Sequence, residues 1–347
     1  MHKEGFVINT MSPQPAADNS LEQQLLAMTL GVAQTHALGV AAQLGLADLL
    51  QNGPQSVAAL ASATRTHPST LARLMAMLVH MGLFAEIAPG QFSCTPLGAL
   101  LQANAPHSMR HYALLMSGEW FAHAWPHLIQ SFYSGTSAFE PIFGINMYQY
   151  LQQHPAAEAI LQEAMSDLST REGLAVRSAF DFSPYHTIVD VGGGQGGLLA
   201  TLLQTLPDAR GVLFDLPSVV ERTQALSQLD AFQERCHLVG GDFLEAVPAD
   251  GDIYILKRIL IDRTDAEAWR LLGNIRAAIG PQGRILVADP ESHSLYGKSL
   301  DMFMLVMFGS RLRSNAEVRE LFAQAGFQFT RVVETCSTLR LLEGVPV

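Results

Sequence analysis

A glycine-rich turn with an acidic residue inside it combines the residue types and the spacing that most suggest chemistry. It reads Val189-Asp-Val-Gly-Gly-Gly-Gln-Gly-Gly197 and stands between an apolar run and a segment with helical spacing. Glycines allow a cofactor to approach the backbone closely, and Gly192, Gly194 and Gly197 match the GxGxxG spacing of nucleotide-binding turns. By itself this match suits a dinucleotide as well as another nucleoside cofactor.

Three aspartates distinguish between these cofactors. Asp190 precedes the glycines, where a carboxylate would repel a pyrophosphate but attract the methionine ammonium of S-adenosylmethionine. Asp215 ends the next apolar run, at the distance where an acidic residue binds ribose hydroxyls. Asp242 follows the third run beside Phe243, a pair suited to the amino group and the ring of adenine. Each aspartate alone could be a helix N-cap or turn residue, but the set predicts S-adenosylmethionine as cofactor and S-adenosylhomocysteine as product.

The segments that must position these residues alternate between short apolar runs and amphipathic stretches. Strands are predicted at Thr187–Val191, Gly211–Asp215, Cys236–Val239, Asp252–Leu256 and Arg284–Ala288. Helices are predicted at Gly197–Leu206, Ser218–Leu229, Ala266–Ala278 and Asn315–Ala325. Such alternation is typical of a parallel sheet with helices on both faces. We therefore expect an α/β, doubly wound, Rossmann-like domain over residues 181–347.

The N-terminal part of the chain has a different pattern. Helical spacing extends over residues 21–101, and the apolar stretch Ala37–Leu50 is expected to be a helix buried against another chain or domain. Two short strands are predicted at Leu83–Ile87 and Gln91–Thr95. Three helices and a hairpin are the plan of a winged helix, which often binds DNA. Its reading helix has Arg73 as the one firmly basic residue, so dimerisation is favoured over DNA binding.

These patterns divide the chain into four regions. Residues 1–20 are expected to be a flexible tail, and residues 21–105 a mainly helical, winged-helix-like dimerisation domain. Residues 106–180 are expected to be a helical linker that contributes to a substrate pocket, because aromatic residues are dense there. The cofactor-binding domain, residues 181–347, follows.

Composition limits the partners. The chain has 347 residues, with 21 Lys and Arg against 32 Asp and Glu, and its net charge of −11 opposes binding to nucleic acid or to an anionic membrane. Polar residues interrupt its apolar stretches before any reaches the roughly 20 residues of a membrane span. Three widely separated cysteines argue against a disulfide framework, and the histidines show no metal-binding spacing. We expect a cytoplasmic protein without bound metal, membrane or nucleic acid.

Four motifs in a fixed order carry a family resemblance. They are Val-Asp-Val-Gly-Gly-Gly-x-Gly, Phe-Asp-Leu-Pro, Gly-Gly-Asp-Phe and Ile-Leu-Lys-Arg-Ile-Leu. The chain resembles the class I methyltransferases of the plant caffeic-acid O-methyltransferase type over nearly all its length, and in particular bacterial members that act on antibiotic pigments such as phenazines. The resemblance implies a homodimer intertwined through the N-terminal domain and a small aromatic substrate. It implies cofactor-binding roles for Asp190, Gly192, Gly193, Gly194, Asp215, Leu216, Gly241, Asp242, Phe243, Lys257 and Arg258.

This chain departs from the family at the position of the acceptor chemistry. In the plant-type enzymes a His follows the Leu-Lys-x-x-Leu stretch and removes the phenol proton, whereas this chain has Ile261 there. Arg263 replaces the family's Trp, and the two acids that orient the His correspond to Asp289 and Leu312. A His-centred base is therefore not expected.

Three other residues are weak candidates for a base. They are Asp262, Asp289 and His293. Asp262 is favoured as a cap of the following helix, and His293 as a solvated loop residue.

Methyl transfer can proceed without a base. Alignment of the reactants supplies on the order of 7 to 11 kcal/mol, and a base is needed only when the nucleophile is protonated at working pH. We therefore hypothesise O-methylation of a phenazine-type hydroxyl or N-hydroxyl by proximity and desolvation. Methylation of a ring nitrogen, chemistry other than methyl transfer, and a ligand-sensing regulator that binds DNA are the alternatives.

Aromatic and methionine side chains suit a flat acceptor. Core packing is the simpler role for most of them, including those of the segment Asp301–Phe308. The residues predicted to line the acceptor pocket are Trp120, Phe121, Trp125, Met165, Met304, Met307 and Phe308.

Overall fold

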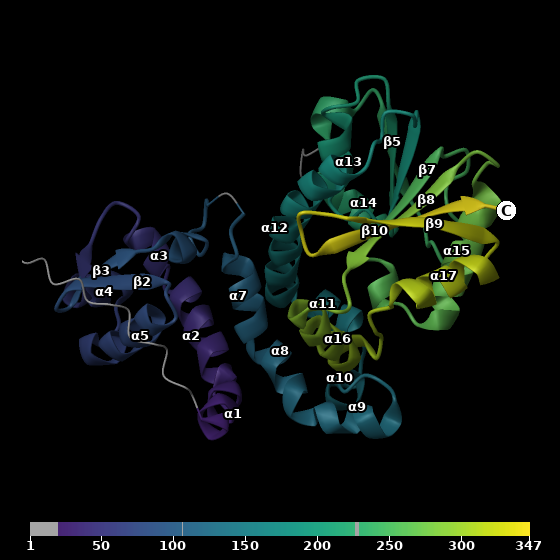
Figure 1. Cartoon of the computed structure of the whole chain (residues 1–347). Coiled ribbons are helices and arrows are strands. Elements are labelled where there is room, and N and C mark those ends of the chain that lie inside the picture. The colour runs from purple at the N-terminus through teal and green to yellow at the C-terminus, as the bar shows by residue number, and fades with distance from the viewer. Residues whose placement is uncertain (1–19, 106, 226–228) are drawn as a thin grey trace, which may run out of the picture.

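The structure is a computed structural model that describes residues 20–105, 107–225 and 229–347. The predicted flexible tail, apart from Ser20, lies outside the described residues. Figure 1 shows a small N-terminal unit beside a larger unit built on a twisted sheet, with helices α7 (Arg110–Ser117) and α12 (Pro155–Ala179) between them. Within the described residues no single helix is long and apolar enough to cross a membrane, although helices α1 and α2, which are bent against each other, pass that test as a pair.

The N-terminal unit has the predicted winged-helix plan. Its helices are α1 (Leu21–Thr29), α2 (Gly31–Gln43), α3 (Leu46–Leu49), α4 (Val57–Thr64), α5 (Pro68–His80) and α6 (Pro96–Ala99). Its strands β1 (Gln55–Ser56), β2 (Phe84–Ala88) and β3 (Gln91–Cys94) form an antiparallel sheet in the order β1-β3-β2. Helix α5 begins with Pro68 at its first turn and buries Leu71, Met75 and Leu78, the spacing that directs one helical stripe into a core.

The helix predicted over Ala37–Leu50 is interrupted, so this part of the prediction is wrong. Helix α2 ends at Gln43 and α3 begins at Leu46. Gly45 between them has φ 63°, a left-handed conformation that ends a helix and is open to glycine. The expected burial is present, since α2 packs against α7 of the linker and buries Ala41 and Ala42.

The linker is helical, as predicted. It comprises α7, α8 (Glu119–Ala124), η1 (Trp125–His127), α9 (Leu128–Ser134), α10 (Phe139–Phe143), α11 (Met147–Gln153) and α12. Helices α8 to α11 lie below the sheet in Figure 1 together with α16 (Leu295–Phe308). Phe121 and Phe139, both buried, pack there with Val306 and Met307 of α16. The linker and the C-terminal part of the chain therefore share one core.

A seven-stranded sheet organises the larger unit, in the order β6-β5-β4-β7-β8-β10-β9. Its strands are β4 (Thr187–Val191), β5 (Arg210–Asp215), β6 (Cys236–Gly240), β7 (Ile253–Lys257), β8 (Arg284–Pro290), β9 (Phe327–Glu334) and β10 (Leu339–Pro346). The five predicted strands are present and parallel. Strands β9 and β10 form an antiparallel hairpin against β8 that the sequence pattern did not predict.

The four predicted helices of this unit are present with different ends. They are α13 (Gly197–Leu203), α14 (Pro217–Gln224), α15 (Asp265–Ala278) and α17 (Asn315–Gln324), alongside α16 and the short helices η2 (Asp230–Phe232) and η3 (Leu260–Asp262). The prediction for α14 extended into residues 226–228, which lie outside the described residues.

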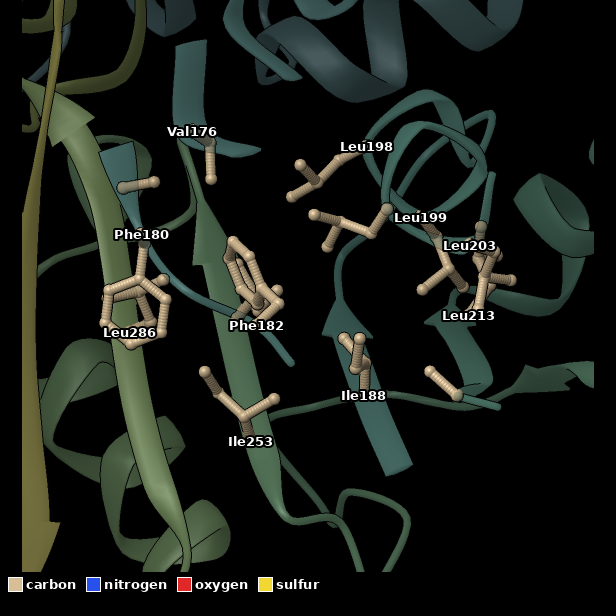
Figure 2. Packing of buried hydrophobic residues seen from close by; sticks show 14 of the residues in the cluster. Val176, Phe180, Phe182, Ile188, Leu198, Leu199, Leu203, Leu213, Ile253 and Leu286 are labelled. Atoms are coloured by element: carbon tan, nitrogen blue, oxygen red, sulfur yellow. The ribbon is translucent and has the colours of Figure 1, made fainter. Parts of the chain in front are cut away.

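Apolar side chains cover the sheet on both faces. Figure 2 shows one face, where Val176 of α12 and Leu198 and Leu199 of α13 pack toward Ile188 and Ile253 of the strands. On the other face α15 and α17 pack against a second cluster of strand residues. Burial on both faces is the reason why these strands are continuous apolar runs.

Candidate functional site

The carboxyl ends of the parallel strands meet at one edge of the sheet, and the predicted cofactor residues lie along it. In the aligned register Asp215 of β5 is opposite Gly240 of β6, and Asp190 of β4 is opposite Ile255 of β7. The crevice outside such strand ends is the usual ligand site of an open α/β sheet. The structure therefore brings the three aspartates and the glycine turn to the same edge.

The glycine turn is shaped by close contacts that a side chain would disturb. Gly192 and Gly194 have φ of 71° and 56°, a region that favours glycine. A Cβ on Gly193 would lie 2.9 Å from the Asp190 carboxyl, and a Cβ on Gly192 would lie 2.3 Å from Ile259. At Gly194 a Cβ would meet nothing within 4 Å, so this side of the turn faces open space.

Asp190 is a buried carboxylate with an unsatisfied oxygen. The residue is 1% exposed, and its Oδ2 has no hydrogen-bond partner among the described residues. Burial raises the pKa of Asp190 to about 7, against the lowering effect of Lys257. A buried polar atom without a partner is costly. A ligand that brings a cation or a hydrogen-bond donor to this oxygen would remove that cost.

Asp215 ties the strand end to the turn. Its Oδ2 accepts from the Gly194 amide at 2.9 Å, its Oδ1 accepts from the Leu216 amide at 2.7 Å, and its carbonyl accepts from the Gly241 amide at 2.9 Å. Burial raises the pKa of this carboxyl, and the two amide hydrogen bonds oppose that rise. These contacts hold Asp215 between the glycine turn and the end of β6.

The third aspartate lies at the outer end of the same edge. Asp242 is exposed and accepts from the Leu244 amide at 2.8 Å. The Phe243 ring lies next to the glycine turn, 3.7 Å from a Cβ placed on Gly192, and the Arg263 guanidinium lies 5.2 Å above the ring. Asp242 and Phe243 therefore lie at the same edge as the glycine turn, and their contact with adenine stays a prediction.

Lys257 and Arg258 at the end of β7 meet a buried acid from the linker. Glu172 of α12 is 2% exposed, and its carboxylate accepts from Nε and Nη2 of Arg258. The Lys257 ammonium lies 3.9 Å from Glu172. Burial lowers the pKa of Lys257. Burial alone would raise the pKa of Glu172, but the charge of Arg258 outweighs it, so the pKa of Glu172 is lowered. Arg258 thus has an internal partner, and its cofactor role stays a prediction.

Ile261 lies in an apolar cluster. It is 4% exposed and packs with Leu300 and Met304 of α16 and with Leu312. Tyr296, Phe303 and Phe308 pack against the same cluster. The position at which the plant-type enzymes have a base is therefore surrounded here by aliphatic and aromatic side chains.

The predicted acceptor residues fall into two adjoining clusters. Met304 belongs to the Ile261 cluster, and Phe308 packs against both clusters. Trp120, Phe121, Trp125, Met165 and Met307 belong to the linker cluster or pack against it. Phe121 and Phe303 stack with ring centres 5.0 Å apart, so rings from the linker and α16 meet directly. Their contact with an acceptor stays a prediction.

The prediction that Asp262 caps the following helix is wrong. Thr264 is the N-cap of α15 and forms a capping box with Glu267. Asp262 instead accepts a hydrogen bond from the hydroxyl of Tyr148 on α11, and burial raises its pKa. The N-cap is the residue directly before the first helical residue. Helix α15 begins at Asp265, so the N-cap is Thr264, two residues after Asp262.

The other two base candidates differ in their surroundings. Asp289 is 5% exposed, its Oδ1 has no hydrogen-bond partner among the described residues, and burial raises its pKa to about 7. His293 is exposed in the loop before α16, as expected for a solvated histidine. The charge of Asp262, the neighbour of Ile261 in the chain, contributes to the raised pKa of Asp289.

Sequence reasoning missed Glu172 and Tyr148. Glu172 and Arg258 are 86 residues apart, and Tyr148 and Asp262 are 114 apart. No local motif links such pairs. The one available signal was Glu172 itself, a charged residue on the apolar side of a long helix.

The residues at the strand ends fit S-adenosylmethionine. The unsatisfied Asp190 oxygen suits a cationic group, Asp215 suits hydroxyls, and the Gly194 side of the turn is open. No group of three or more metal-ligating side chains occurs within residues 20–105, 107–225 and 229–347.

Known proteins share both parts of this chain. Residues 125–328 match the O-methyltransferase domain family, and residues 26–104 match the O-methyltransferase dimerisation domain. A phenazine O-methyltransferase from Lysobacter antibioticus is 39% identical over 331 residues, which cover 94% of this chain and 97% of that protein. A phenazine-1-carboxylate N-methyltransferase from Pseudomonas aeruginosa is 34% identical over 330 residues, 92% of this chain and 96% of that protein.

Solved structures agree with the fold and the cofactor. The structure of a methyltransferase in calicheamicin biosynthesis, in its S-adenosylhomocysteine-bound form, has a TM-score of 0.84 at 34% identity and covers 95% of this chain and 100% of that one. The predicted Rossmann-like fold, family and cofactor are thereby confirmed. The chain belongs to the S-adenosylmethionine-dependent methyltransferases that join an O-methyltransferase domain to a dimerisation domain.

Proposed function

We propose that this enzyme methylates a hydroxyl or N-hydroxyl group on a small, planar, phenazine-type acceptor in the synthesis of a secondary metabolite. The single observation that carries the mechanism is the apolar surrounding of Ile261. The names of the relatives support the acceptor class, since one acts as a phenazine O-methyltransferase and another as a phenazine-1-carboxylate N-methyltransferase. Methylation of a ring nitrogen is the second candidate, and the latter relative favours it.

The cofactor end would be held by the strand-end residues. We assign Asp190 to the cationic methionine part, Asp215 to the ribose, and Asp242 with Phe243 to the adenine. Gly192, Gly193, Gly194, Leu216 and Gly241 would supply backbone around the same turn, and we assign Lys257, whose charge lowers the pKa of Asp190, and the following Arg258 to the same end. When bound, S-adenosylmethionine supplies an electrophilic methyl group, whose bonding electron pair returns to sulfur.

The acceptor end would act by alignment and exclusion of water. Ile261, Met304 and Leu312 form an apolar wall, and the rings of Phe303 and Phe308 pack against it. An acceptor lone pair forms the new bond to the methyl carbon, and a hydroxyl acceptor also loses its proton. Because the Ile261 side chain cannot take a proton, we expect the acceptor to be ionised in solution or to be a neutral ring nitrogen.

Single-turnover methyl transfer over a range of pH tests this proposal. With labelled cofactor and a hydroxyphenazine, we expect the rate to follow the ionisation of the acceptor, and to be unchanged in Asp289→Asn and His293→Ala. A labelled methyl group located by NMR on a ring nitrogen of phenazine-1-carboxylate, with no transfer to the hydroxyphenazine, would favour nitrogen methylation. A rate that collapses in Asp289→Asn while S-adenosylhomocysteine still binds would show a protein base and would contradict the mechanism.

We also propose that the enzyme is a homodimer joined through residues 21–105. Helix α1 buries no residue within its own chain, and Leu21, Leu25 and Met28 are each more than half exposed. Such apolar exposure is costly unless another surface covers it. Sedimentation equilibrium should give twice the chain mass, and Leu21→Glu combined with Leu25→Glu should give the monomer.

A further inference from the structure

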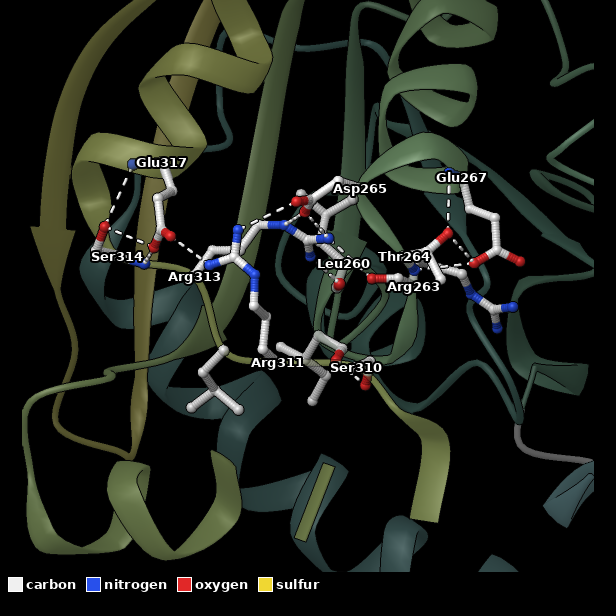
Figure 3. Close-up of polar contacts among 12 residues, drawn as sticks. Leu260, Arg263, Thr264, Asp265, Glu267, Ser310, Arg311, Arg313, Ser314 and Glu317 are labelled. Atoms are coloured by element: carbon white, nitrogen blue, oxygen red, sulfur yellow. Dashed lines mark hydrogen bonds and ion pairs between the residues drawn. The ribbon is translucent and has the colours of Figure 1, made fainter. Parts of the chain in front are cut away.

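The segment 260–263, which carries Ile261, is held through its backbone. Three of its four carbonyl oxygens accept hydrogen bonds from the stretch that follows α16 (Figure 3). Ser310 Oγ donates to the Ile261 carbonyl at 2.8 Å. Arg313 donates from Nη1 to the Leu260 carbonyl and from Nη2 to the Arg263 carbonyl.

Arg313 is itself held from behind. It is 4% exposed, and its guanidinium also donates to Oδ1 of Asp265 at 2.7 and 3.0 Å. Its carbonyl accepts from Nη2 of Arg340 on β10, while Nη1 of Arg340 donates to the Pro290 carbonyl at the end of β8. Two buried arginines in series therefore connect the last strands of the sheet to the segment that carries Ile261.

Arg311 provides a contrast within the same stretch. It also binds Asp265, at 3.1 Å, and it pairs with Glu317 of α17 (Figure 3). Its side chain is 46% exposed, and its hydrogen bonds go to these two carboxylates. Arg311 thus shares the charge of Arg313 and its acidic partner, without a bond to the segment 260–263.

We propose that Arg313, assisted by Ser310, is a positioning residue for methyl transfer, because it fixes the backbone that presents Ile261 to the acceptor. This inference rests on the proposed function, in which alignment replaces a base. The planar guanidinium has several donors in a fixed arrangement, so one side chain can hold two carbonyls and a carboxylate at once. A displacement of about 1 Å at such a wall can lower a rate by about 10²-fold.

Four variants separate positioning from charge. Arg313→Met removes the donors, Arg313→Lys keeps the charge but has a single ammonium, Ser310→Ala removes the Ile261 bond alone, and Arg311→Gln is the matched control. With a hydroxyphenazine, we expect the single-turnover rate to fall about 10²-fold in Arg313→Met and by at least threefold in Ser310→Ala. S-adenosylhomocysteine affinity should stay within twofold, and Arg311→Gln should react like the wild type.

Hydrogen exchange of the peptide spanning residues 258–266 gives a readout independent of activity. Exchange should accelerate in Arg313→Met and Ser310→Ala, but not in Arg311→Gln. A wild-type rate and wild-type exchange in Arg313→Lys would overturn the inference, because charge alone would then suffice, and Ser310→Ala decides if Arg313→Met does not fold. If the wild type methylates neither phenazine probe, the proposed function fails, while the exchange comparison still tests the positioning contacts.

Discussion

Replacing Asp190 by Asn tests the electrostatic basis of cofactor binding. Burial raises the pKa of Asp190 to about 7, so the carboxylate is half protonated near neutral pH in the unliganded enzyme. A cationic ligand requires the ionised form. The ionised fraction falls from about nine tenths at pH 8 to about one tenth at pH 6, so the dissociation constant of S-adenosylhomocysteine should rise about tenfold over that range.

The Asn variant should lose this pH dependence and bind more weakly at pH 8. A hydrogen bond to a charged group contributes about 1.5 to 3 kcal/mol, so the loss should be about ten- to a hundredfold. In the wild type, the free energy of unfolding should depend on pH in the opposite direction to cofactor affinity. Because the folded-state pKa is raised, the folded enzyme retains a proton that the unfolded chain releases, and the unliganded wild type should become more stable as pH falls from about 7 toward 4.

Calorimetric titration at pH 6, 7 and 8 measures the binding effect, and urea unfolding at pH 5, 6 and 7 measures the stability effect. Asp208→Asn, which changes an exposed residue in the turn before β5, is the matched control for loss of one charge. Equal pH slopes in the wild type and in Asp190→Asn would refute the assignment of Asp190 to the cationic part of the cofactor.

Two further substitutions test contacts away from the glycine turn. Glu172→Gln should lower the free energy of unfolding by about 3 to 5 kcal/mol, since it leaves Arg258, whose side chain is 13% exposed, without its counter-charge. Because Arg258 lowers the pKa of Glu172, the stabilisation should be present above about pH 4.5 and be lost at more acid pH in the wild type, as acid titration monitored by circular dichroism would show. Thr264→Ala should cost about 1 kcal/mol in urea unfolding through loss of the α15 cap, whereas Thr264→Ser, which keeps the capping hydroxyl, should cost less; equal costs in the two variants would contradict the capping role.

The parallel half of the sheet could be predicted because its signal is local. Strand β4 coincides with the predicted Thr187–Val191, since burial on both faces makes such a strand a continuous apolar run bounded by polar residues. Strand β10 lacks that signal. It contains Arg340 and Glu343, which are buried because they have partners in β8, β9 and the Arg313 segment. These charged side chains can be buried in a central strand only because the fold supplies their partners, and the sequence pattern does not show those partners.

The candidate site also has one part that could be predicted from local sequence and one part that could not. The glycine turn with Asp190 and Asp215 could be predicted because one short loop and one strand end carry the residues. Glu172 and Tyr148 could not, because they reach the strand ends from the linker helices α12 and α11. A contact between segments far apart in sequence depends on how helices pack, and residue spacing does not record it.

The cofactor end of the site depends on side chains, whereas the acceptor end is held through its backbone. This difference affects how the acceptor chemistry can vary. In the proposed assignment the side chains of Asp190 and Asp215 carry the interaction at the cofactor end, so a substitution there should remove it. At the acceptor end the segment around Ile261 is held through carbonyl oxygens, which any residue at position 261 would still offer. A change of side chain at this position can therefore replace a base by an apolar wall without displacing the backbone. An acceptor with its own ionised oxygen or free ring nitrogen needs no base at this position, so it is compatible with the apolar wall.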